Sequence, residues 1–282
     1  MSDRKLVDLP TPNKKASQDS GTSSDNDPAV KRRRGIYLLP NLFTTACLFA
    51  GFYAIVASMT GRFESAAMAI FIAMVMDGLD GRVARLTNTQ SDFGAQYDSL
   101  ADMVSFGLAP ALVVFQWSLS GLGKLGWLAA FVYTASAALR LARFNTPGGM
   151  ADKNYFQGLA SPAAAAVVAG MIWIGMDYQL DPVALKIPVL VITVMVGLLM
   201  VSNIRYKSFK DLDLKGKVPF VAVLAVMLVF VFISTDPPLV LFSIFMLYAI
   251  SGPVLTLKDI RAKRASRSRS EKDKEEDKEE EE

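Results

Sequence analysis

The sequence predicts an all-α polytopic membrane protein with about eight transmembrane helices. Of its 282 residues, 52% are hydrophobic, and they gather in long apolar runs with few charges. Runs of roughly 17–25 apolar residues are what a helix needs to cross a hydrocarbon core about 30 Å thick. Turn-forming residues separate the runs, and Asp236-Pro237-Pro238 splits the last stretch into two spans. The predicted spans are 37–59, 65–86, 95–118, 125–143, 161–178, 187–203, 218–234 and 239–256.

The two ends of the chain differ from this apolar middle. Residues 1–34 are polar and close with the basic cluster 31–34, so they are expected to form a disordered cytoplasmic tail. Residues 258–282 are basic and then acidic, which predicts a second disordered, solvated tail. Alternatively, the basic half of that tail lies on anionic lipid headgroups. The transmembrane domain is therefore expected over residues 35–257.

The distribution of basic residues predicts the orientation in the membrane. With the N-terminus inside, the loops on the opposite side hold only Arg62, Lys124 and Lys186 as basic residues. This bias is what the positive-inside rule expects of a membrane protein with both termini in the cytoplasm. The cytoplasmic loops are then those near 87–94, 144–160 and 204–217.

Two features of the composition restrict the chemistry. The chain has no histidine, which excludes a histidine base, a Ser-His-Asp triad and imidazole metal ligands. Its one cysteine, Cys47, lies in an apolar run and cannot form an internal disulfide. Catalysis is left to carboxylates, Lys, Arg, Tyr, hydroxyls or a metal ion held by oxygen.

Predicted spans two and three carry acidic residues. Asp77 and Asp80 are three residues apart, and Asp98 and Asp102 are four apart, so each pair shares one helix face. The short connection between the spans makes them antiparallel neighbours, and the pairs can face each other near the cytoplasmic ends. Burying one such acid in a membrane costs at least ~2.5–3.5 kcal/mol. Two divalent ions would balance four carboxylates, and all-oxygen ligation favours Mg²⁺ or Mn²⁺.

The neighbouring residues suit a phosphate ligand. Gly81 and Gly94 leave room for close approach, and Arg85 lies one turn beyond Gly81 to neutralise phosphate charge. One alternative is that the acids only pair with Arg82 and Arg85 to join two helices, but two arginines cannot neutralise four aspartates. A cation transporter is the other alternative. It does not explain why the acids cluster at one membrane face with glycines between them.

These residues form the pattern Asp-x2-Asp-Gly-x2-Ala-Arg-x8-Gly-x3-Asp-x3-Asp. In this pattern the chain resembles the CDP-alcohol phosphotransferase family. The resemblance implies a six-helix core, a bimetal site open to the cytoplasm, transfer of a phosphatidyl group from a CDP-linked lipid to an alcohol, and a homodimer. Predicted spans seven and eight would be additions to that core. The matching positions are Asp77, Asp80, Gly81, Ala84, Arg85, Gly94, Asp98 and Asp102.

Within this family the flanking sequence is similar to the membrane-embedded bacterial phosphatidylserine synthases. The similarity lies in residues 105–111, 140–145 and 156–162, with Ala160 where that group is expected to have proline. It implies that the substrates are CDP-diacylglycerol and L-serine, and that the products are phosphatidylserine and CMP.

The resemblance also implies residue roles. Asp77, Asp80 and Asp98 would be metal ligands, and Asp102 would be both a ligand and the general base. The residues expected at the nucleotide and diphosphate are Gly81, Ala84, Arg85, Gly94, Asn41 and Thr44. Asn41 and Thr44 are equally explained as the start of a helix, because Asn is a good N-cap.

The acceptor is expected to bind at the end of the fourth span. Arg140 and Arg143 are three residues apart on one face, suited to a carboxylate or phosphate, and Asn145 follows closely. Arginine also commonly ends a helix that leaves the membrane on the cytoplasmic side. Glycerol 3-phosphate and inositol phosphate would use the same arginines. Choline would need an aromatic cage, which is not evident.

Overall fold

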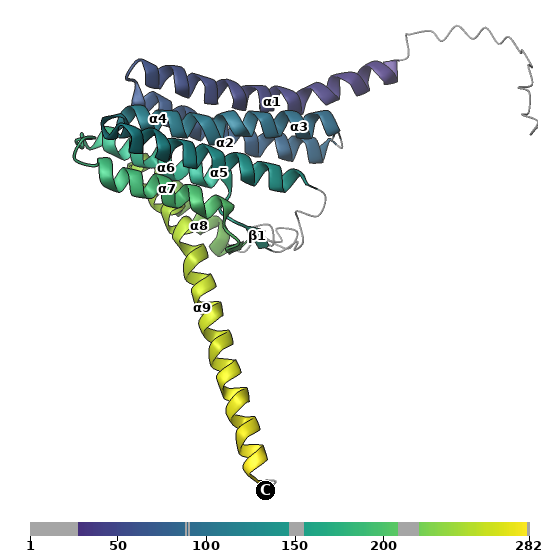
Figure 1. Cartoon of the computed structure of the whole chain (residues 1–282). Coiled ribbons are helices and arrows are strands. Elements are labelled where there is room, and N and C mark those ends of the chain that lie inside the picture. The colour runs from purple at the N-terminus through teal and green to yellow at the C-terminus, as the bar shows by residue number, and fades with distance from the viewer. Residues whose placement is uncertain (1–27, 88, 90, 147–154, 208–219, 281–282) are drawn as a thin grey trace, which may run out of the picture.

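The computed structural model of the chain describes residues 28–87, 89, 91–146, 155–207 and 220–280. Most of these residues are helical, and Figure 1 shows α1 to α7 packed side by side, with α9 extending away from them. The elements are α1 (Pro28–Met59), α2 (Phe63–Leu86), α3 (Asp92–Asp102), the π-helical η1 (Met103–Leu108), α4 (Ala109–Trp117), the 3₁₀-helical η2 (Leu119–Leu122), α5 (Lys124–Asn145), β1 (Tyr155–Gln157), α6 (Ser161–Asp177), α7 (Lys186–Val201), β2 (Arg205–Lys207), α8 (Phe220–Thr235) and α9 (Pro237–Glu280).

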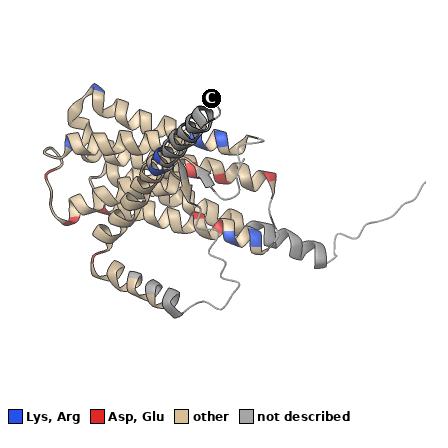
Figure 2. Ribbon diagram, turned by 90° about the horizontal axis from the view of Figure 1, so that it is seen from below, with Lys and Arg blue, Asp and Glu red and all other residues tan. Residues whose placement is uncertain are grey.

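The predicted class, an all-helical membrane protein, is confirmed. Each predicted span coincides with a helix, and the third is built from α3, η1 and α4 in succession. Four segments of the described chain are long and apolar enough to cross a membrane, and α6 and α7 are shorter apolar helices. The four are Pro40–Met59, Asp92–Trp117, Lys124–Asn145 and Pro237–Lys258. Figure 2 shows that most of the bundle carries neither acidic nor basic residues.

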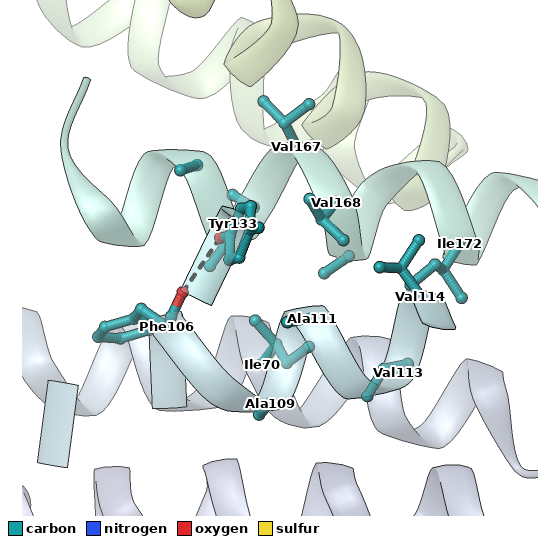
Figure 3. Packing of buried hydrophobic residues seen from close by; sticks show 14 of the residues in the cluster. Ile70, Phe106, Ala109, Ala111, Val113, Val114, Tyr133, Val167, Val168 and Ile172 are labelled. Carbon is teal, nitrogen blue, oxygen red and sulfur yellow. Dashed lines mark hydrogen bonds between the residues drawn. The ribbon is translucent and has the colours of Figure 1, made fainter. Parts of the chain in front are cut away.

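Helix α6 occupies the centre of the bundle. Its alanines and valines are buried almost without interruption from Ser161 to Ile172, because small side chains allow neighbouring helices to approach closely. The first half of α9 packs on α6, where Gly170 makes room: a Cβ there would lie 3.0 Å from that of Phe242. In Figure 3 Val168 and Ile172 of α6 lie on the side of Val114 of α4, while Val167 points to the opposite side.

A short antiparallel pair of strands connects the end of the bundle to α9. Strand β1 pairs with β2, with Phe156 opposite Tyr206. The buried Tyr206 donates a hydrogen bond of 2.9 Å to the Ala249 carbonyl of α9. The side chain of Tyr206 also packs directly against Gly252, so α9 is held at this end of the bundle.

Helices extend into both of the segments expected to be tails. Helix α1 begins at Pro28, inside the predicted disordered segment 1–34, and α9 continues to Glu280 across the predicted disordered segment 258–282. Lys, Arg and Glu are good helix formers, and charge pairs four residues apart stabilise exposed helices, so a polar composition does not prevent helix formation. Residues 1–27 lie outside the described residues.

The N-cap interpretation of Asn41 and Thr44 is wrong. Both residues lie inside α1, which continues through Pro40 although this proline removes one backbone donor from the helix. Within the same helix, the Thr44 hydroxyl lies 3.1 Å from the Pro40 carbonyl, one turn earlier.

Candidate active site

Three of the four predicted aspartates converge where α2 and α3 meet. One carboxylate oxygen from each of Asp77, Asp98 and Asp102 lies within 4.8 Å of the other two. Asp77 comes from α2, and the other two come from one face of α3. The antiparallel arrangement predicted from the short connection is therefore confirmed, and it forms an all-oxygen group of acids.

The start of α3 is determined locally. Ser91 is the N-cap, and its hydroxyl accepts a 3.0 Å hydrogen bond from the Gly94 backbone N–H. Asp92 follows in the first turn, where a negative charge is favoured by the helix dipole. These interactions start the helix immediately after the turn that ends α2, so Asp98 and Asp102 lie opposite the end of α2.

Asp80 lies beside this group and contacts α1. It is buried, with 5% of its surface exposed, and its Oδ2 lies 3.0 Å from the Thr44 hydroxyl. A second polar contact, 2.9 Å between the Thr45 and Tyr97 hydroxyls, joins α1 to α3. Asp80 is therefore oriented by α1 toward the pocket described below, while the other three acids face one another.

Among the described residues, no lysine or arginine forms an ion pair with the aspartates. Within the described part of the chain, neither Arg82 nor Arg85 forms an ion pair with them; Arg85 Nε donates to the Gly81 carbonyl at 2.8 Å. The alternative that these arginines neutralise the acids therefore does not hold. Among the described residues, the buried Oδ1 of Asp102 also has no hydrogen-bond partner. Clustered, unpaired carboxylates with a free buried oxygen fit a divalent cation.

A pocket of about 300 Å³ opens next to Asp80 and Asp98, between α1, α2 and the start of α3. This volume is at the lower end of the range for small-molecule sites. All six residues expected at the nucleotide lie on its wall, although they come from three helices. They are Asn41, Thr44, Gly81, Ala84, Arg85 and Gly94.

Replacing Gly81 tests whether this pocket holds a substrate. A Cβ at Gly81 would have no other atom within 4 Å, so the Gly81→Leu side chain would occupy the pocket without disturbing α2. We expect the KM for the donor substrate to rise about tenfold or more, which corresponds to a steric cost of roughly 1.4 kcal/mol. Steady-state kinetics with the donor varied would measure it.

Gly78 offers the matched control. It lies one turn earlier in α2, a Cβ there also meets open space, and it is not part of the pocket wall. Gly78→Leu should leave the donor KM unchanged. An equal rise in both variants would mean that the pocket is not where the donor binds.

Arg140 is buried at the end of α5. Its Nη1 donates to the Ser161 hydroxyl at 3.4 Å, and its guanidinium lies 5.1 Å from the ring centre of Phe144. Its Nε is buried and has no hydrogen-bond partner among the described residues. Arg140 interacts electrostatically with Asp102 and with Tyr248 of α9. It is therefore a buried cation with a free donor, close to the carboxylates.

Arg143 and Asn145 have different surroundings. Arg143 is exposed and donates a hydrogen bond to the Gln157 side chain of β1. Asn145 donates a 3.0 Å hydrogen bond to the hydroxyl of Ser99, which directly follows Asp98 in α3. Both residues thus connect α5 to segments next to the site.

The partners of Arg140 were not predicted from the sequence. Ser161 lies in the stretch 156–162, which resembles the family, but its contact with Arg140 was not expected. Tyr248 lies in the eighth span, which was treated as an addition to the core. A stretch of sequence that recurs in a family was the available sign for Ser161, and the sequence holds no sign for Tyr248.

Comparison with known proteins identifies the family of this chain. The sequence profile described as "CDP-alcohol phosphatidyltransferase" matches residues 37–255. The chain is 38% identical over 218 residues to a Helicobacter pylori protein named CDP-diacylglycerol–serine O-phosphatidyltransferase, covering 77% of this chain and 90% of that protein. A Bacillus subtilis protein of the same name is 33% identical over 172 residues, covering 61% of this chain and 91% of that protein. The chain therefore belongs to the CDP-alcohol phosphatidyltransferase family of enzymes.

Proposed function

We propose that this enzyme transfers the phosphatidyl group of CDP-diacylglycerol to the hydroxyl of L-serine, giving phosphatidylserine and CMP. The observation that carries the choice of acceptor is the buried guanidinium of Arg140, whose Nε has no partner among the described residues. A charged donor of this kind matches the carboxylate of an amino acid. The names of the relatives from Helicobacter pylori and Bacillus subtilis support the same acceptor.

The pocket beside Asp80 would hold the cytidine diphosphate part of the donor. Gly81 and Ala84 leave its wall open, so a nucleotide can approach the α2 backbone. Arg85 also lies on this wall, with its Nε bonded to the Gly81 carbonyl, and its terminal nitrogens would neutralise phosphate charge.

Asp77, Asp98 and Asp102 would hold divalent cations, Mg²⁺ or Mn²⁺, and Asp80 would complete a site for two ions. Such ions, when bound, neutralise the charge on the diphosphate and on the entering and leaving oxygens. The aspartates would hold the ions beside the pocket that would receive the donor.

Asp102 would act as the general base. The serine hydroxyl gives its proton to the Asp102 carboxylate as its oxygen forms a bond to the phosphorus attached to diacylglycerol. The bond from this phosphorus to the CMP oxygen breaks, and CMP leaves. Arg140 interacts electrostatically with Asp102, so an acceptor carboxylate held by Arg140 would keep the hydroxyl close to the base.

Arg140→Ala tests the carboxylate role. Losing a charge-assisted hydrogen bond typically costs about 1.5–3 kcal/mol, so we expect the KM for serine to rise roughly 10–100-fold. The KM for CDP-diacylglycerol should change little. Arg62→Ala is the matched control, since Arg62 lies over the Tyr53 ring at the opposite end of the bundle. An unchanged KM for serine in Arg140→Ala would remove Arg140 from acceptor binding.

A panel of acceptors tests the choice of serine itself. Purified enzyme with CDP-diacylglycerol and Mn²⁺ is given serine, glycerol 3-phosphate, inositol phosphate or choline, and the lipid product is identified by mass spectrometry. Phosphatidylserine should be the main product. Faster formation of a lipid whose headgroup carries an additional phosphate, from glycerol 3-phosphate or inositol phosphate, would instead assign the arginines to a phosphate-bearing acceptor.

We also propose that the protein is a multi-pass protein of the bacterial inner membrane with the aspartates at its cytoplasmic face. The turns that carry Arg62, Lys124 and Lys186 lie at the end of the bundle opposite to the turn between α2 and α3 (Figure 1). This distribution agrees with the positive-inside rule. A homodimer stays a prediction from the family resemblance.

A further inference from the structure

The π-helical segment η1 follows Asp102 directly. The Ala109 N–H bonds to the Val104 carbonyl five residues earlier, instead of the usual four. A π-turn of this kind inserts one extra residue into a helix and often marks a functional site. An α-helix turns by about 100° per residue. One extra residue therefore rotates the side chains of α3 about the helix axis by about 100° relative to those of α4.

Pro110 is the cause of this irregularity. Pro110 has no N–H, and a proline ring crowds the carbonyl four residues earlier, which here is that of Phe106. The hydroxyl of Tyr133 on α5 donates a 3.1 Å hydrogen bond to this carbonyl, as Figure 3 shows. Phe106 and Tyr133 are both fully buried. Tyr133 therefore supplies the donor that Pro110 lacks.

Helix α1 holds η1 from the other side. The Ser105 hydroxyl donates to the Cys47 carbonyl at 3.0 Å. Gly51 allows this close approach, because a Cβ there would lie 2.6 Å from the Ser105 Cα. The irregular segment is thus fixed between two helices, with a side-chain hydrogen bond on each side.

We infer that Tyr133 is a positioning residue for Asp98 and Asp102, acting through η1. Helix α4 is fixed by the core, in which Val113 and Val114 are completely buried. If η1 changed to a regular α-helix, α3 would turn relative to α4 and carry Asp98 and Asp102 away from Asp77. The π-turn lets one helix present its apolar face to the core and its acidic face to α2.

The inference rests on the proposed metal site and is tested with Tyr133→Phe. We expect the affinity of the purified full chain for Mn²⁺, measured by electron paramagnetic resonance of free Mn²⁺, to fall about 10–100-fold, as for other residues that orient metal ligands. The kcat should fall by a similar factor. The KM for CDP-diacylglycerol should stay within about twofold, because α1 and α2 supply most of the pocket wall.

Tyr206→Phe is the matched control. It also removes a buried tyrosine hydroxyl that donates to a backbone carbonyl, that of Ala249, at a place outside η1. Both variants should lower the melting temperature, but only Tyr133→Phe should weaken Mn²⁺ binding. Equal Mn²⁺ affinity in the two variants would overturn the inference and leave Tyr133 with a role in stability alone.

A double variant distinguishes an effect on the position of Asp98 and Asp102 from an effect on the stability of the protein. When Tyr133→Phe is combined with Pro110→Ala, the backbone N–H of residue 110 can donate to the Phe106 carbonyl, and η1 can become α-helical. We expect the melting temperature to recover while Mn²⁺ affinity stays low. Recovery of Mn²⁺ affinity would contradict the inference. If the wild-type protein binds no Mn²⁺, the proposed metal site fails, and this inference fails with it.

Discussion

Asp102→Asn is expected to abolish turnover while the protein stays folded. Asparagine has nearly the same size but cannot accept the proton of the acceptor hydroxyl, and loss of a general base typically costs roughly 10²–10⁴-fold in rate. Weaker cation binding adds to the loss, because the Asp102 carboxylate lies within 4.8 Å of those of Asp77 and Asp98. CMP release and thermal unfolding, measured on the same preparation, would check both parts of the prediction.

Asp92→Asn provides the comparison for this variant. Asp92 belongs to the same helix and undergoes the same chemical change, but it is exposed and is not one of the clustered acids. Its activity should stay close to that of the wild type. Substantial synthesis of product by Asp102→Asn would remove Asp102 from the role of base.

Removing divalent cations is expected to have the second large effect. Chelation should reduce activity to background, and added Mn²⁺ should restore it, since no cation of the described chain forms an ion pair with the clustered acids. Binding should also stabilise the fold, by about 2.7 kcal/mol when Mn²⁺ is at 100 times its Kd. A titration of the melting temperature with Mn²⁺ measures this effect.

Asp77→Asn distinguishes specific binding from a general effect of salt. Without metal, this variant should melt above the metal-free wild type, because one of three mutually repelling carboxylates is neutral. With Mn²⁺, its gain in melting temperature should be smaller. Full activity of the chelated wild type would contradict the proposed role of cations.

Much of the site could be predicted from the sequence, because its main parts lie close together in the chain. The acids occur at helical spacing on two neighbouring helices, so α2 and α3 had to bring Asp77, Asp98 and Asp102 together. Gly81 and Arg85 follow Asp77 on α2. Placing Asn41 and Thr44 in the same pocket relied on the family resemblance, and the structure confirms their position on its wall.

The remaining features depend on contacts between distant segments. The π-turn is not visible in hydrophobic periodicity, and Pro110 indicates it only once Tyr133 is known to face Phe106. The environment of Arg140 combines residues of α5, α6 and α9, which no local pattern connects. The tails were predicted as disordered from their charge, although the same residues are good helix formers.

We propose that the aspartate cluster, with bound divalent cations, catalyses phosphatidyl transfer to serine. The most direct test of this proposal is CMP release from CDP-diacylglycerol by the purified wild-type protein, with serine and Mn²⁺ each present or absent. CMP should be released only when both are present, and Asp102→Asn should release none under the same conditions. Release of CMP without serine, or in the presence of excess chelator, would contradict it.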